Sequence, residues 1–251
     1  MITQYQFVFD GLDRPLPSFW AYRLYAWLLT QVPPQVAEEL HEVGEKPLSQ
    51  HLLREPETGR TRWVINLLED ETAAAFRPVL EGLAEVPLHT GRLRLHCERV
   101  ETKTAYQLVE EARAGEAGRR MTMRFLTPTA FKTEGRYAIF PQVKWLVHTL
   151  AMRWSRIFPE LPLEDPDALA ALERGITVAD YALHTTRYPL KNIRIPSFLG
   201  NITLESRLAA PMEEIWQLLL RFAPYAGVGI KTTLGMGGVQ TAAESRYNRE
   251  E

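Results

Sequence analysis

The sequence predicts an α+β protein built from two consecutive domains, and three observations predict this class. Short alternating apolar runs, typical of strands, are interspersed in both halves with longer runs of helical period. Residues 110–120 are charged and small and include two glycines, which is typical of a linker. A length of 251 residues can hold one large or two small domains.

Residues 1–114 have the element order of one folding unit. The expected elements are, in order, a strand over 5–9, a helix over 17–29, a second helix ending near 42, a strand over 61–68, a helix over 71–84, and strands over 88–100 and 105–109. We interpret this order as the β-α-β-β-α-β unit of a ferredoxin-like (RRM-like) domain.

Residues 115–251 repeat this architecture more loosely, without an internal sequence repeat. The expected elements are a strand over 119–125, a helix over 142–158, strands over 177–188 and 194–208, a helix over 211–222, a glycine-rich loop over 227–238 and a last strand after it. The element order predicts a second ferredoxin-like domain in tandem with the first.

Composition indicates a folded protein whose charges are unevenly distributed. The hydrophobic content of 45% and aromatic content of 10% are ordinary for a globular chain. The net charge of −2 argues against a uniformly basic nucleic-acid binder. Basic residues nevertheless far outnumber acidic ones across 119–144 and 187–207. A local basic face of this kind is enough to hold several phosphates.

Cysteine usage and the N-terminal sequence exclude several classes of protein. The single cysteine, Cys97, rules out an internal disulfide and a cysteine-rich zinc site. Since it alternates with Leu93 and Leu95, we expect Cys97 to be buried in a strand. No metal or cofactor motif is present, the N-terminus does not read as a signal peptide, and no apolar run approaches the length of a membrane span. We therefore expect a soluble, cytoplasmic protein without a cofactor.

The most informative segment is the glycine-rich loop, where five glycines fall in twelve residues. Such density indicates a backbone that needs positive φ angles or close approach to a ligand, and Lys231 lies in its middle. A nucleotide-triphosphate P-loop is excluded because Ile230 stands where its last glycine should be, and a helix precedes the loop instead of following it. The dinucleotide fingerprint fails as well, since Thr232 and Gln240 occupy its third glycine position. A tight turn without a ligand is the remaining structural alternative.

This loop resembles the signature loop of the RAMP superfamily, and within it that of the CRISPR repeat-processing endoribonucleases (the Cas-six family). Residues 125–132, Phe-Leu-Thr-Pro-Thr-Ala-Phe-Lys, resemble the Phe-x-Thr-Pro-Thr-x-Phe-Lys segment of that family. Residues 40–49 are similar to its His…Lys-Pro-Phe-Thr segment, with Leu48 and Ser49 replacing Phe and Thr. Residues 196–202 resemble a strand of its second domain.

The resemblance implies a metal-independent endoribonuclease that cuts CRISPR precursor RNA within its repeats. A ribose 2′-hydroxyl would attack the adjacent phosphorus, leaving a 2′,3′-cyclic phosphate and a 5′-hydroxyl. The implied partners are repeat RNA, the mature crRNA and other Cas proteins of an interference complex, and a homodimer is left open. The alternative is a non-catalytic RAMP subunit that coats guide RNA, which would need the basic face but no acid–base residue.

Three residues are implied as catalytic. His41 lies in the last turn of its expected helix, where the negative end of the helix dipole favours an imidazolium, and it would act as acid or base. Lys46 would stabilise phosphate charge, and Tyr25 would position the scissile phosphate. Two rivals remain: Tyr22 competes with Tyr25, and His51, expected in a loop, competes with His41.

The expected RNA-binding residues are glycines of the loop and basic residues of the second half. They are Gly227, Gly229, Lys231, Gly235, Gly237, Lys191, Arg194, Arg124 and Lys132. The lysines and arginines would contact phosphates, and the glycines would let backbone amides reach them.

Overall fold

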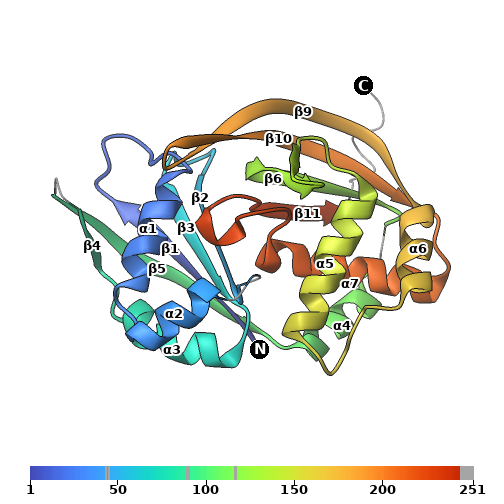
Figure 1. Ribbon diagram of the computed structural model, residues 1–251, viewed down its shortest axis with the longest axis horizontal. Helices are drawn as coiled ribbons and strands as arrows, with labels where there is room; N and C mark the ends of the chain where they lie inside the picture. The colour runs from blue at the N-terminus through green and yellow to red at the C-terminus, as the bar shows by residue number, and fades with distance from the viewer. Residues whose placement is uncertain (43, 45, 89–90, 116–117, 244–251) are drawn as a thin grey trace.

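The computed structural model describes residues 1–42, 44, 46–88, 91–115 and 118–243. Two β-sheets lie side by side along the long axis of the molecule, and each has helices packed against it (Figure 1). A hairpin forms a separate two-stranded sheet.

The first sheet has the order β2-β3-β1-β5-β4, and all of its strand pairs are antiparallel. Its domain consists of β1 (Ile2–Asp10), α1 (Trp20–Leu29), α2 (Pro34–Glu42), β2 (Leu48–Arg54), β3 (Thr61–Leu67), α3 (Asp70–Glu81), β4 (Glu85–Leu88) and β5 (Gly91–Lys103). With β4 set aside as an edge addition, the remaining strand order is that of a ferredoxin-like domain. This confirms the predicted fold.

The second sheet has the order β11-β6-β10-β9, again with antiparallel pairs only. Its elements are β6 (Arg120–Thr129), β7 (Phe131–Thr133), β8 (Arg136–Ala138), α5 (Val143–Ile157), α6 (Pro166–Gly175), β9 (Ile176–Leu190), β10 (Ile193–Ser206), α7 (Ala210–Ala226), the 3₁₀ turn η1 (Thr232–Leu234) and β11 (Val239–Ala243). With the β7–β8 hairpin and α6 set aside as insertions, the strand order is again that of a ferredoxin-like domain. This confirms the predicted second domain.

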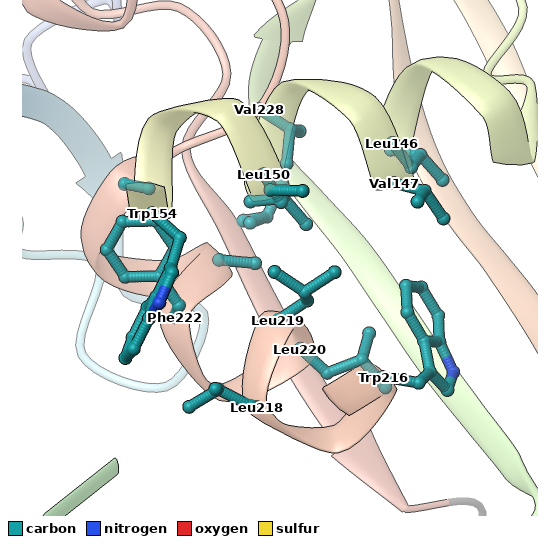
Figure 2. Close-up of a cluster of buried hydrophobic side chains, with 14 of the residues drawn as sticks. Leu146, Val147, Leu150, Trp154, Trp216, Leu218, Leu219, Leu220, Phe222 and Val228 are labelled. Atoms are coloured by element: carbon teal, nitrogen blue, oxygen red, sulfur yellow. The ribbon is translucent and has the colours of Figure 1, made fainter. Parts of the chain in front are cut away.

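Part of the core of the second domain lies between α5 and α7 (Figure 2). Leu150 and Trp154 of α5 point toward Leu219 and Phe222 of α7, and all four side chains are fully buried. Val228 joins this cluster from the glycine-rich loop. The loop is therefore anchored in the hydrophobic core at its first turn.

Two expectations for residues 91–114 are wrong. Residues 105–109 belong to a helix, α4 (Ala105–Ala114), which opens with a reciprocal capping box between Thr104 and Gln107. Cys97 is exposed and not buried, at a register shift where Phe7 pairs with Cys97 but Gln6 pairs with Arg99.

Helix α4 connects the two sheets. Its buried residues Ala105, Leu108 and Ala112 belong to the core of the second domain. A domain boundary after residue 114 stays a prediction. Helix α4 precedes this boundary in the sequence but packs into the core of the second domain.

Polar side chains of β2 fasten the first domain to the second. Ser49 Oγ donates to the carbonyl of Tyr225 at 2.6 Å. Gln50 Nε2 donates to the carbonyls of Ala21 and Thr233 at 2.9 and 2.8 Å. Because these groups are buried and hydrogen-bonded, they fix α1, β2 and the glycine-rich loop relative to one another.

No helix in the described ranges is long and apolar enough to cross a membrane.

Candidate active site

A cleft of about 1060 Å³ lies where the two domains meet. The first domain contributes α1, α2 and the residues after α2, and the second contributes α5, the β9–β10 turn and the glycine-rich loop. The lining includes half of the predicted site residues, namely Tyr25, His41, Lys46, Lys191, Gly229 and Lys231, together with the rival Tyr22.

His41 lies in the last turn of α2 and its side chain is exposed, as predicted from the sequence. The helix is held by its neighbour Leu40, which is buried in the core of the first domain, together with Val36 and Ala37. This anchoring leaves the imidazole of His41 at the wall of the cleft.

Lys46 caps the C-terminal end of α2. Its Nζ donates to the carbonyl of Leu40 and, at 3.4 Å, to that of His41. A cation here satisfies carbonyls that the helix leaves unpaired and lies at the negative end of the helix dipole. Partial burial lowers the pKa of the Lys46 ammonium. Lys46 therefore fixes the turn that carries His41 and adds positive charge to the same cleft.

Tyr25 reaches the cleft from α1 with only 4% of its surface exposed. Its hydroxyl is buried and has no hydrogen-bond partner within the described ranges. Burial raises its pKa to about 12, so the phenol stays protonated. It can donate one hydrogen bond to a group in the cleft.

Tyr22, the rival of Tyr25, also lines the cleft and is half-buried. The Lys191 ammonium lies 5.8 Å from the centre of its ring, in a cation–π contact. Both tyrosines therefore stay candidates by their position in the cleft. Of the two, Tyr25 is the one whose hydroxyl is buried without a hydrogen-bond partner among the described residues.

His51 does not lie in a loop. It is part of β2, is 5% exposed and does not line the cleft. A Cβ added at Gly238 would come within 2.7 Å of its ring, so the imidazole is packed against the backbone of the second domain. Burial lowers the pKa of His51 to about 4, which leaves it neutral near pH 7. These features favour a packing role for His51. They leave His41 as the acid–base candidate of the two.

The glycine-rich loop has the backbone predicted for it. Gly227, Gly229, Gly235 and Gly237 all have φ between 71° and 97°, and Lys231 also adopts the left-handed region, with φ 56°. The close approach, however, is mostly to protein atoms, since an added Cβ at each glycine would meet the chain within 3 Å.

Several amides of this loop are already engaged inside the protein. The N–H groups of Val228, Ile230 and Gly237 donate to the carbonyls of Gly237, Ala130 and Pro128 at 2.9, 2.9 and 3.2 Å. Of the four candidate glycines, only Gly229 lines the cleft. RNA binding by all four stays a prediction, and their packing against the protein accounts for the glycine requirement.

The packing role can be tested with a matched pair of glycines. Gly229→Ala is expected to destabilise the protein by about 2–5 kcal/mol: ~1–2 for the left-handed backbone and ~1–3 for overpacking, because its Cβ would lie 2.3 Å from the Ala130 oxygen. Gly11 has a similar φ of 64° but open space around its Cβ position, so Gly11→Ala should cost only the backbone term. Urea unfolding compares the two, and equal losses would contradict the packing account.

Arg153 of α5 is the functional candidate that sequence reasoning missed. It is 4% exposed, and its Nη1 donates to Thr232 Oγ1 at 2.8 Å. Its Nη2 donates to the carbonyls of Lys46 and Leu48, each at 3.3 Å. The guanidinium therefore connects the segment after α2 to the glycine-rich loop. The sequence signal for Arg153 is its position on the apolar side of a helix, between Leu150 and Trp154. A charge at such a position is buried and therefore needs specific partners.

The remaining basic candidates are spread over the second domain. Lys191 lies in the β9–β10 turn with φ 52° and lines the cleft. Arg194, Arg124 and Lys132 are exposed on β10, β6 and β7 and lie outside the cleft lining. The structure thus brings Lys46, Lys191 and Lys231 to one cleft and leaves the other three on the surrounding surface. Among the residues described, no group of His, Cys, Asp and Glu could hold a metal ion.

Comparison with known proteins identifies the family. A CRISPR-associated endoribonuclease Cas6 of Streptococcus thermophilus is 30% identical over 236 residues, which cover 93% of this chain and 96% of that protein. The chain belongs to the Cas6 family. The Cas6 endoribonuclease of Mycobacterium tuberculosis is 27% identical over 239 residues, covering 91% of this chain and 74% of that protein. The family model for CRISPR-associated endoribonuclease Cas6 matches residues 123–239.

Solved Cas6 structures share the fold over nearly the whole chain. A Cas6 product complex superposes with a TM-score of 0.75 at 28% identity, covering 96% of this chain and 99% of that one. Cas6 of Thermus thermophilus gives a TM-score of 0.71 at 26% identity, over 96% and 97% of the two chains. The chain is thus a CRISPR-associated endoribonuclease by family, as its sequence motifs indicated.

Proposed function

We propose that this protein cuts CRISPR precursor RNA within its repeats by metal-independent transesterification, with His41, Lys46 and Tyr25 as its catalytic residues. The observation that supports this most strongly is the single cleft that gathers these three side chains together with Lys191 and Lys231. Solved Cas6 relatives described as product complexes support an RNA ligand in the family.

The reaction balances without a metal or a cofactor. The ribose 2′-oxygen forms a bond to the adjacent phosphorus, the bond from phosphorus to the 5′-oxygen breaks, and a proton moves from the first oxygen to the second. His41 accepts or donates that proton. The ammonium groups of Lys46 and Lys231 stabilise charge on the non-bridging oxygens, and the Tyr25 hydroxyl donates a hydrogen bond to the phosphate.

The expected products are a 2′,3′-cyclic phosphate on the upstream fragment and a 5′-hydroxyl on the downstream fragment. The test is incubation of the protein with labelled repeat RNA in excess EDTA, followed by mapping of both ends. Cleavage that persists in EDTA with these ends is the expected result. Loss of cleavage in EDTA, or a 5′-phosphate, would contradict the proposed chemistry. Binding without any cleavage would favour the alternative of a non-catalytic RAMP subunit.

Lys231 is proposed to hold the RNA backbone, because its side chain is exposed in the cleft and its backbone lies in the left-handed region. Lys231→Ala is expected to weaken RNA binding and to lower the slope of log affinity against log salt by about 0.7, the value for one lost phosphate contact on single-stranded RNA. Titrations at several salt concentrations measure this slope. Lys144→Ala, which removes an exposed lysine of α5 outside the cleft lining, is the control. A slope in Lys231→Ala equal to that of the wild-type protein would remove Lys231 from the binding site.

The roles of Lys191, Arg194, Arg124 and Lys132 as further phosphate contacts also belong to this proposal. So does retention of the crRNA product and its delivery to other Cas proteins.

A further inference from the structure

One wall of the cleft is apolar, although phosphate chemistry needs charge. Tyr22, Leu190, Ile230 and Leu234 line the cleft, and all four belong to or pack against one hydrophobic cluster around the buried Tyr188 and Ile195. The volume of about 1060 Å³ lies just above the range of ordinary ligand pockets, roughly 300–1,000 Å³. The cleft therefore has room and surface for more than a phosphodiester.

The β9–β10 turn completes this wall. Ile193 lines the cleft with 51% of its surface exposed. Asn192, beside it, also lines the cleft, is exposed, and makes no side-chain hydrogen bond within the described part of the chain. Its carboxamide offers two donors and one acceptor, which can pair with the edge of a base. Lys191 places a cation 5.8 Å from the centre of the Tyr22 ring, where it can meet a phosphate.

An aromatic ring, apolar side chains, a carboxamide and lysines around one cleft are the features with which proteins bind an unpaired nucleotide. The base stacks on the aromatic ring, its edge pairs with a polar side chain, and its phosphate meets the cations. A fully charged ligand would leave the apolar wall without a contact. We propose that the wall formed by Tyr22 and Ile193 binds one unpaired nucleobase next to the scissile phosphate, with Asn192 hydrogen-bonding its edge.

This inference rests on the proposed function, and its test is chosen so that the two can fail separately. The probe is a repeat RNA with a 2′-deoxy sugar immediately upstream of the scissile phosphate, which removes the proposed nucleophile, so affinity is measured without cleavage. An abasic nucleotide is moved through the unpaired positions of this RNA. Dissociation constants are measured for the wild-type protein, Tyr22→Leu, and Tyr106→Leu as a control. Tyr106 is an exposed tyrosine of α4 outside the cleft lining.

One abasic position is expected to weaken binding to the wild-type protein by about 5- to 100-fold, the effect of losing one stacked base. The same abasic change should weaken binding to Tyr22→Leu by less than about 2-fold, since the stacking partner is already missing. Tyr106→Leu should keep the full penalty. Asn192→Ala should flatten the preference among the four bases at that position.

An abasic penalty of equal size in wild-type protein and Tyr22→Leu would overturn the proposal, as would the lack of any sensitive position. A repeat RNA that binds with the expected abasic pattern but is never cut in its all-ribose form would instead contradict the proposed catalytic function and leave the base site standing.

Discussion

His41→Ala is expected to slow repeat cleavage by about a hundred- to ten-thousand-fold, the usual effect of removing one acid–base group. RNA affinity should stay nearly unchanged, because Lys46, Lys191 and Lys231 still line the cleft. Single-turnover cleavage and a binding titration on the same RNA measure the two effects.

Two histidine variants serve as controls. His148→Ala removes an exposed histidine of α5 outside the cleft lining and should cut at the wild-type rate. His51→Gln, checked for correct folding, should retain cleavage because its ring is packed against Gly238. A wild-type rate in His41→Ala would exclude His41. A folded His51→Gln without activity would transfer the role to His51.

Local sequence patterns predicted the parts of the fold that local forces decide. Helical periods placed α5 and α7, and the density of glycines correctly predicted positive φ at residues 227, 229, 235 and 237. The position of His41 in the last turn of its helix also followed from the sequence. Each of these features is decided by residues that are close together in the chain, so it can be predicted from a single sequence.

Strand β2 was missed because both of its faces are buried, one by its own domain and the other by the second domain. Ser49, Gln50 and His51 are buried polar residues in its middle, so the strand has no apolar alternation to detect. The hydrogen bonds of Ser49 and Gln50 to the second domain explain why polar residues are tolerated there.

The sequence predicted several of the residues that line the cleft but not the residues that hold them in place. The sequence motifs led to His41, Lys46 and Lys231, which the structure brings to one cleft. They did not lead to Arg153, because its contacts with Thr232, Lys46 and Leu48 join segments far apart in the chain. They predicted RNA binding by the glycines, and the structure adds a further reason for glycine at 235 and 237, since both are packed against protein atoms.

Replacement of the 2′-hydroxyl is the most direct test of the proposed mechanism, in which RNA supplies its own nucleophile and the cleft supplies acid–base and charge stabilisation. A repeat with one 2′-deoxy sugar immediately upstream of the scissile phosphate lacks that nucleophile but keeps nearly every group that the protein contacts. The wild-type protein is expected to bind this RNA with the affinity of the all-ribose repeat and to yield no product over the time in which the all-ribose repeat is fully cut. Cleavage of the deoxy repeat at the same bond would contradict the mechanism and assign the attack to water.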